Sequence, residues 1–235
     1  MLSDREPDIL TALYSGAAIM VAFFFPPPGR VSVTVVPNYV TTRTSAADAT
    51  IFTFNASSIG TAAADRIVCI YPCSDDATSI SSVTINGNAA TKVGSDDNTN
   101  GDAVGCWFYL LVSTGTTADI VITFGSGGFS CACHVYAIYN SSLVPIWNDV
   151  DKATPFSLTQ TIPAGGAFIA AYSSDGSSGA LSGVTTRFDS EIGNDFYTQV
   201  GEYASATEVI DHVVTHDGLS VSDQRLCGLI WGPAT

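Results

Sequence analysis

The segment SDDNTNGD concentrates the oxygen-bearing side chains that a calcium ion prefers. Asp96, Asn98 and Asn100 alternate as the first ligands of a calcium loop do, and the glycine that follows them allows a sharp turn. The twelfth position of such a loop supplies a bidentate glutamate, but the residue there is Trp107. We therefore predict an acidic turn that uses Asn, Asp and Gly for their backbone tolerance. Calcium at these three positions is the alternative, and no other metal or cofactor is expected.

Two histidines lie close together in DHVVTHD, each beside an aspartate. In a strand, His212 and His216 would share one face, because side chains alternate with a period of two. An Asp–His acid–base couple or a metal-binding pair is one interpretation of this pattern. No nucleophile on a G-x-S-x-G turn accompanies them. We expect strand histidines that hydrogen-bond to their neighbours.

A pair of carboxylates in RFDSEIG has the spacing that would place both on one face of a strand. Asp189 and Glu191 could then form the acid pair of a glycosidase, if their carboxyl groups lie at the separation such enzymes need. An acidic β protein also contains pairs of this kind by chance. We predict no catalytic residues and a protein that is not an enzyme.

Three tryptophans offer rings that could stack on a sugar. Trp107 and Trp231 lie within apolar runs, which favours a place in the core. Trp147, in VPIWNDVD, lies among hydrogen-bonding side chains and is the one ligand-binding candidate. Its alternative role is packing in the core or at an interface.

Six cysteines are present, and five of them lie in or beside apolar runs. We expect buried free thiols that pack as small hydrophobic side chains. Cys131 and Cys133 would share one strand face, which is a poor geometry for a mutual disulfide. A zinc site built from these two and His134 would lack a second ligand pair at the usual spacing.

Charged residues are few, and most of them are acidic. The chain has 22 acidic and 8 basic side chains, which give a formal net charge of −14. No basic stripe could follow a phosphate backbone, so we expect no nucleic-acid partner. A basic partner surface would be attracted instead, and self-repulsion would keep the free protein soluble.

Runs typical of β-strands recur at short intervals along the chain. RVSVTVV and TIFTFNA alternate, whereas DRIVCIYPC is a denser apolar run, consistent with a central strand covered on both faces. Asn86-Gly87 is a strong hairpin signal, because a type I′ turn needs positive φ at both residues. We predict an all-β chain with an antiparallel β-sandwich, jelly-roll-like, over residues 29–235. The loosest connection, 141–154, could subdivide this domain.

Residues 1–28 are predicted to form a separate, extended apolar N-terminal arm or anchor. Ile9–Phe25 contains no charged residue and is at the lower limit for a membrane span, and the acidic MLSDREPD before it is unlike a signal peptide. We favour an arm that packs into a neighbouring subunit, and expect no membrane partner. An export or membrane segment, or a natural start at Met20, are the alternatives. The expected assembly residues of the arm are Ile9, Leu10, Leu13, Tyr14, Phe23, Phe24 and Phe25.

A longer stretch resembles a known class of protein. DRIVCIYPCSDDATSISSVTINGNAATKV, followed by WFYLLVSTGTTADIVITFGSGGFSCACHVYAIYN, resembles a β-sandwich domain of tailed-bacteriophage structural proteins. The likeness lies in the order of parts: Asp-Arg before a buried strand, a VTI-x-G-x-AAT hairpin, an aromatic strand, and the strands TGTTADIVITF and VYAIYN. PAGGAFIAAYSS is similar to the family's central strand entry. The resemblance covers approximately residues 60–175 and contains no catalytic motif.

The resemblance implies a protein of the virion. We expect a capsid decoration (cement) or head-fibre protein that packs on the particle surface, with other virion proteins and further copies of this chain, as a trimer or dimer, for partners. The alternative is a tail or tail-fibre component that binds host surface carbohydrate. Sugar depolymerases occur among phage tail proteins, which keeps the carboxylate pair as an enzymatic alternative.

Overall fold

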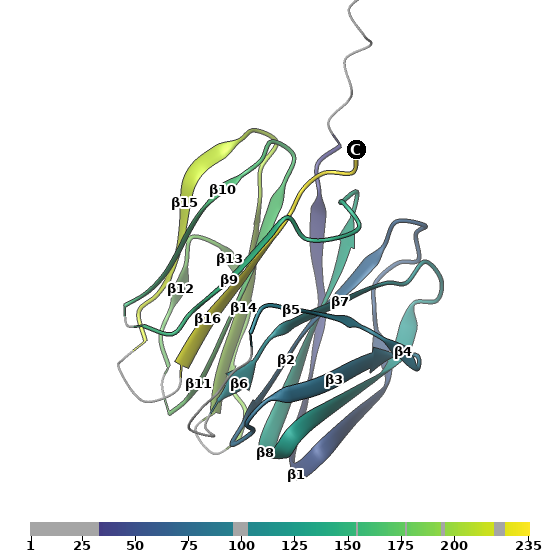
Figure 1. The fold of residues 1–235 in the computed structure, drawn as a ribbon, viewed down its shortest axis with the longest axis vertical. Coiled ribbons are helices and arrows are strands. Elements are labelled where there is room, and N and C mark those ends of the chain that lie inside the picture. The colour runs from purple at the N-terminus through teal and green to yellow at the C-terminus, as the bar shows by residue number, and fades with distance from the viewer. Residues whose placement is uncertain (1–32, 96–102, 154, 177, 194–195, 219–223) are drawn as a thin grey trace, which may run out of the picture. The chain divides into compact units, whose positions relative to one another are not determined.

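The computed structural model describes residues 33–95, 103–153, 155–176, 178–193, 196–218 and 224–235. These residues form β-strands and turns within one compact unit, and none of them belongs to a helix that could cross a membrane (Figure 1). The strands are β1 (Val36–Ser58), β2 (Ile67–Asp75), β3 (Ile80–Ile85), β4 (Asn88–Ala89), β5 (Thr91–Val93), β6 (Val104–Gly105), β7 (Trp107–Leu111), β8 (Thr117–Tyr139), β9 (Trp147–Asp151), β10 (Phe156–Ile162), β11 (Ala167–Asp175), β12 (Leu181–Ser182), β13 (Thr185–Glu191), β14 (Phe196–Ala204), β15 (Val209–His216) and β16 (Gln224–Trp231).

Two long antiparallel strands, β1 and β8, organise an eight-stranded sheet. On the other side of β8, strand β2 pairs with its C-terminal half and β3 with its N-terminal half. The strand order along the eight-stranded sheet is β4-β3-β8-β2-β7-β5, with β1 paired to β8 and β6 paired to β2. The register of β1 against β8 shifts at four places. Because each bulge bends and twists the ladder, this sheet curls around a core of its own.

The C-terminal half of the chain forms two further antiparallel sheets. Their orders are β13-β14-β11-β16-β9 and β10-β15-β12. The five-stranded sheet is covered on both faces: Ile169 and Ala171 of β11 pack with the eight-stranded sheet, whereas Phe168 and Tyr172 pack with the three-stranded sheet. The predicted all-β antiparallel sandwich is confirmed.

Strands β2 and β11 are buried along almost their whole length. In β2, Ile67 and Cys69 face the five-stranded sheet, and Val68 and Ile70 face the inner core of the curled sheet. A strand with two buried faces favours apolar residues at successive positions, which explains the apolar run from Ile67 to Cys73. Its predicted place as a central strand is confirmed.

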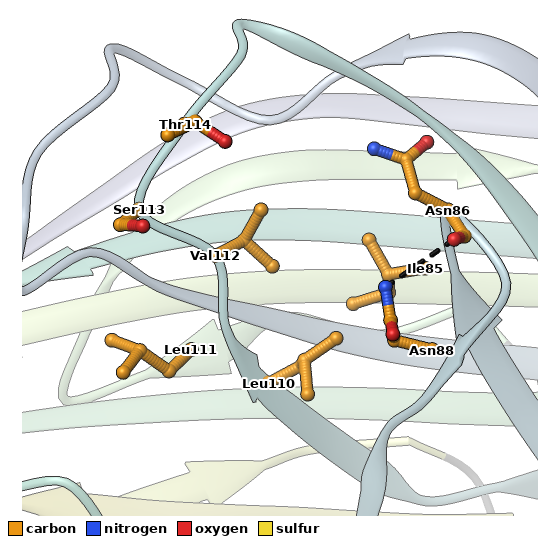
Figure 2. Close-up of a pocket in the computed structure, with 8 residues that line it drawn as sticks. All are labelled: Ile85, Asn86, Asn88, Leu110, Leu111, Val112, Ser113 and Thr114. Carbon is orange, nitrogen blue, oxygen red and sulfur yellow. Dashed lines mark hydrogen bonds between the residues drawn. The ribbon is translucent and has the colours of Figure 1, made fainter.

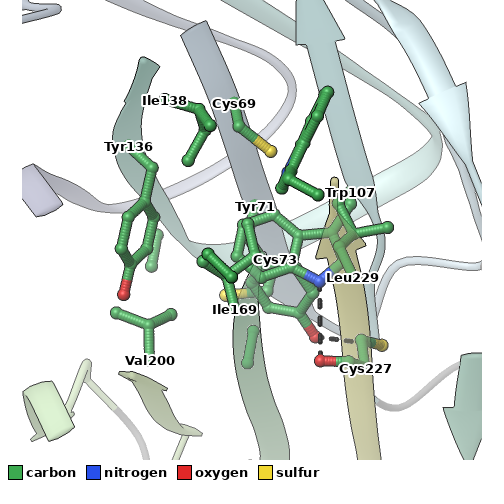
Figure 3. Packing of buried hydrophobic residues seen from close by; sticks show 14 of the residues in the cluster. Cys69, Tyr71, Cys73, Trp107, Tyr136, Ile138, Ile169, Val200, Cys227 and Leu229 are labelled. Carbon is green, nitrogen blue, oxygen red and sulfur yellow. Dashed lines mark hydrogen bonds between the residues drawn. The ribbon is translucent and has the colours of Figure 1, made fainter. Parts of the chain in front are cut away.

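Large aromatic side chains fill the core between the eight- and five-stranded sheets (Figure 3). Their polar atoms reach across it: Trp107 Nε1 donates to the Cys227 carbonyl at 3.5 Å, and the Tyr71 hydroxyl lies 3.0 Å from Ser173 Oγ. A buried hydroxyl or indole N–H is costly without a partner. These bonds therefore fix how the two layers sit on one another.

Arg66, from the Asp-Arg pair before β2, has no exposed surface. Its Nε donates to the Val112 carbonyl at 2.8 Å, and Nη2 donates to the Thr114 carbonyl at 2.8 Å. Nη1 donates to the carbonyls of Gly60 at 2.7 Å and Gly115 at 2.9 Å. One guanidinium thus holds together the turns that flank β2 and β7.

The Asn86-Gly87 hairpin forms as the sequence predicts. Both residues have positive φ, 50° and 76°, and β3 pairs with β4 through Thr84–Ala89 and Ile85–Asn88. The ladder then ends, because the chain continues into β5, which pairs with β7 instead. The hairpin signal therefore predicted the turn correctly, but not how far its second strand would follow the first.

Candidate functional site

His134 of β8 lies at the centre of a buried hydrogen-bond chain between the two large sheets. Its Nε2 is 2.8 Å from Thr198 Oγ1, and that hydroxyl donates to the Tyr172 carbonyl at 3.0 Å. Because the only hydroxyl proton of Thr198 is used there, Nε2 must carry a proton and donate it. Nδ1 then accepts from Thr42 Oγ1 at 2.6 Å, and Thr42 accepts from the Tyr39 hydroxyl at 2.7 Å.

This arrangement fixes a neutral imidazole. Burial lowers the pKa of His134 to about 3, since nothing charged compensates the lost hydration of an imidazolium. The ring is enclosed by Phe188, at a centroid distance of 5.1 Å, and by Tyr71 at 6.2 Å. His134 therefore joins the sheets, and a base with this pKa is too weak for proton transfer near neutral pH.

The second buried histidine, His216, lies at the end of β15. Its ring stacks on Tyr172 at a centroid distance of 3.4 Å, and its Nδ1 accepts from the Gly218 N–H at 2.9 Å. Nε2 is buried and has no partner among the described residues. Burial lowers the pKa of His216 to about 4, although the carboxylates of Asp217 and Asp189 act in the opposite direction.

Within the pair His212 and His216, each histidine has its own structural role. His212 Nε2 lies 2.8 Å from the Gly183 carbonyl, and its ring stacks on Tyr203 at 4.2 Å. His212 also contacts Phe168, so both histidine rings lie against aromatic residues of the five-stranded sheet. The sequence did not reveal that Asp189, far away along the chain, would lie near His216.

The two carboxylates considered for a glycosidase are bonded within their own sheet. Asp189 Oδ1 accepts from Gln199 Nε2 at 2.9 Å, and Glu191 Oε2 accepts from the Tyr197 hydroxyl at 2.9 Å. Each bond joins residues that are cross-strand partners in β13 and β14. Both carboxylates thus stabilise an edge strand by side-chain pairing.

Trp147 begins the edge strand β9 and is half-buried. Its ring lies 5.8 Å from that of Phe168, and a methyl group added at Gly228 would approach it to 3.1 Å. The ring of Trp147 therefore packs against Phe168, which is the packing role considered as the alternative to sugar binding. Sugar binding through its exposed part stays a prediction.

Two predicted sites lie outside the described residues. These are the calcium candidates Asp96, Asn98 and Asn100, and the arm residues between Ile9 and Phe25. Among the residues that are described, no group of three or more His, Cys, Asp or Glu side chains could hold a metal ion. All six cysteines are buried as free thiols.

A shallow groove runs between the Asn86-Gly87 hairpin and the strand that precedes β8 (Figure 2). Leu110 and Val112 form its apolar side, and on the hairpin Asn88 Nδ2 donates to the Asn86 carbonyl at 3.3 Å. The Asn86 amide is already used, because its Oδ1 accepts from the Asp119 N–H at 2.9 Å. The groove has no charged group among its lining residues with which to fix a ligand.

Two shallow pockets lie between β1, at the edge of the eight-stranded sheet, and β13, at the edge of the five-stranded sheet. Together we call them the β1–β13 cleft. One end is lined by Thr34–Pro37, Thr185, Arg187 and Glu202–Ala204. The other end is lined by Thr42, Thr44–Ala46, Phe188 and Ser190–Gly193. Residue numbers increase in the same direction on both walls, so β1 and β13 run parallel along the cleft.

Charged groups mark one end of the β1–β13 cleft. Arg187 Nε donates to Glu202 Oε1 at 2.5 Å, and about half of the Arg187 side chain is exposed. The hydroxyl of Tyr136 faces the same carboxylate, although without a hydrogen bond of standard geometry. Burial raises the pKa of Glu202, while Arg187 opposes that shift. Sequence patterns missed this ion pair, because its partners are joined only by the pairing of β13 with β14.

A third surface feature is an apolar loop between β8 and β9. Leu143, Val144 and Ile146 are 65%, 55% and 53% exposed. The loop is held by backbone bonds to the C-terminal segment, from Ser142 N–H to the Gly232 carbonyl and from Ile146 N–H to the Ile230 carbonyl, both 2.8 Å. The loop thus presents three neighbouring exposed aliphatic side chains and is tied to the C-terminal segment by backbone hydrogen bonds.

No protein-family model matches the chain, and no curated protein matches it.

Proposed function

We propose that this protein is a non-enzymatic structural component of a tailed-phage virion, a capsid decoration (cement) or head-fibre protein that packs on the particle surface. The resemblance over residues 60–175 supports the class, and the exposed apolar loop at Leu143, Val144 and Ile146 is the observation that carries the role. Such side chains cost free energy in water and are stabilised when a partner covers them.

The polar groups that could do chemistry support the same proposal. His134 and His216 are buried with lowered pKa values, and Asp189 and Glu191 are bonded to their strand neighbours. Each of these side chains contacts or is bonded to its neighbours within the sandwich. The surface instead contains an apolar loop and the β1–β13 cleft between two sheet edges. Both are places where another protein could bind.

Covering the apolar loop would yield a useful free energy. Burial of apolar surface stabilises by about 25 cal/mol per Å², so each fully covered aliphatic side chain contributes about 1.5–3 kcal/mol. With many copies bound to one particle, the free energy gained by covering these loops would sum over all copies. The net charge of −14 favours a basic partner surface and keeps unbound copies apart.

Immunogold labelling of purified virions, from a strain that encodes the chain, tests the proposal. We expect label over the head. Label at the tail would favour the alternative, a tail component that binds host carbohydrate, and absence from virions would refute a virion role altogether.

A matched pair of variants tests the apolar loop. Leu143→Ser combined with Ile146→Ser should lower the amount of protein retained on particles. Ile51→Ser, at a position that is 57% exposed on β1, should leave retention unchanged. Equal retention of all three proteins would remove the loop from the proposal.

A further inference from the structure

The β1–β13 cleft has an unpaired strand edge on each of its walls. Among the described strands, β1 is hydrogen-bonded only to β8, and β13 only to β14. Both strands therefore turn one row of backbone N–H and C=O groups away from their own sheets. Such rows pair readily with an added strand. Because β1 and β13 run in the same direction, an extended segment laid along the cleft would have the same orientation relative to both edges.

Side chains along the cleft are mostly small and uncharged, which leaves room for an added strand. Val35, Val36 and Pro37 form an apolar wall at one end, and Ile192 belongs to the other end. Between the ends, Phe188 is half-buried against His134. The charged groups are bonded within the protein: Arg187 donates to Glu202 Oε1 at one end, and Glu191 Oε2 accepts from Tyr197 at the other.

The position of the cleft points to a segment of this chain. The described residues begin at Val33, and the cleft begins at Thr34, so the chain outside the described body starts at the mouth of the cleft. That outside part includes Ile9–Phe25, seventeen residues without a charge. Fully extended, it would span about 55 Å, against about 40 Å for β1 from Thr34 to Ala46 at the same rise per residue.

We propose that the β1–β13 cleft is the docking site for the N-terminal segment Ile9–Phe25 of a second copy of this chain, which adds a strand to a free sheet edge. The three prolines at 26–28 favour a stiff, extended connection, so the segment reaches a neighbour rather than folding back along its own β1. Reciprocal exchange between two copies closes an isologous dimer. This inference rests on the proposed assembly role and gives it a site.

The test measures the dimer dissociation constant of the full-length chain by sedimentation or light scattering. We expect a dimer for the unmodified protein. Thr44→Arg and Ser190→Arg place a bulky charge inside the cleft at exposed positions, and each should weaken the dimer at least about tenfold. Thr53→Arg is the matched control, because Thr53 is exposed on β1 outside the cleft, and it should change nothing.

Two substitutions in the segment Ile9–Phe25 test the other side of the proposed contact. Leu13→Asp combined with Phe24→Asp should produce monomers that retain the native tryptophan fluorescence. A monomeric unmodified chain, a dimer that survives the arm changes, or equal effects of Thr44→Arg and Thr53→Arg would each overturn the inference. These outcomes are separate from virion labelling: a monomer found on particles refutes only the cleft, and an arm-exchanged dimer absent from particles refutes only the virion role.

Discussion

Acidification from pH 7.5 to pH 5.0 should destabilise this protein through two buried histidines. The folded-state pKa values are about 3 for His134 and about 4 for His216, below the value of about 6.5 for an unfolded histidine. At a pH between the folded-state and unfolded-state pKa values, these histidines are protonated in the unfolded chain but neutral in the folded chain. The free energy of unfolding therefore has its full value above the unfolded-state pKa of these histidines, and it decreases as the pH falls below that pKa.

The magnitude at pH 5.0 depends little on the folded values, because both lie below that pH. Each histidine then costs the difference between about 6.5 and 5.0, at about 1.36 kcal/mol per unit, or about 2 kcal/mol. His134 and His216 together remove about 4 kcal/mol from a domain whose total stability is on the order of 5–15 kcal/mol. Glu202 works in the opposite direction, since its raised pKa favours folding as the pH falls, and it offsets part of the loss.

Urea unfolding followed by tryptophan fluorescence at several pH values between 7.5 and 5.0 measures this loss. The matched variant is His216→Gln, which removes one of the two groups and should reduce the pH-dependent loss to about 2 kcal/mol. If the unfolding free energy of the unmodified protein stays constant or rises over this range, the buried neutral state of His134 and the hydrogen-bond directions derived for it are wrong.

Three further predictions concern stability and binding. Arg66→Met should cost about 3 kcal/mol or more in urea unfolding, since it leaves carbonyl groups without a donor, whereas Arg43→Met should cost less than about 1 kcal/mol; equal costs would contradict the role of Arg66. Cys73, whose pKa burial raises to about 12, and the other five thiols should react with a thiol reagent only after unfolding, and rapid labelling of the native protein would show that their burial is wrong. Trp147→Ala should destabilise the fold by about 1–3 kcal/mol through lost packing on Phe168 and leave glycan-array signals unchanged; loss of a specific signal would establish sugar binding at this ring.

Local patterns predicted the parts of this fold that depend on neighbouring residues. The apolar run at β2 indicated a strand with two buried faces, and Asn86-Gly87 indicated a hairpin turn; both are present. Both follow from chemistry within a few residues: side-chain alternation in the first case and backbone tolerance of positive φ in the second.

Pairings between distant strands could not be predicted in the same way. The alternation in β13 is compatible with an inner or an outer strand, so nothing in RFDSEIG marks it as a sheet edge beside a cleft. The approach of Asp189 to His216 likewise depends on how two sheets pack, which the sequence period does not encode. His134 did carry a local signal, since a single histidine inside the apolar run FSCACHVYAIY is expected to be buried and bonded.

Polar residues in the core of this protein set the alignment of its layers. The pairs Tyr71–Ser173 and His134–Thr198 each join the eight-stranded sheet to the five-stranded sheet, and each would be broken by a shift of one residue in either layer. Apolar contacts alone would tolerate such a shift better, because dispersion is not directional. The proposed docking of an added strand at the β1–β13 cleft requires that alignment to be fixed. The buried polar pairs thus connect the core to the β1–β13 cleft, where the alignment of β1 and β13 determines whether an added strand can dock.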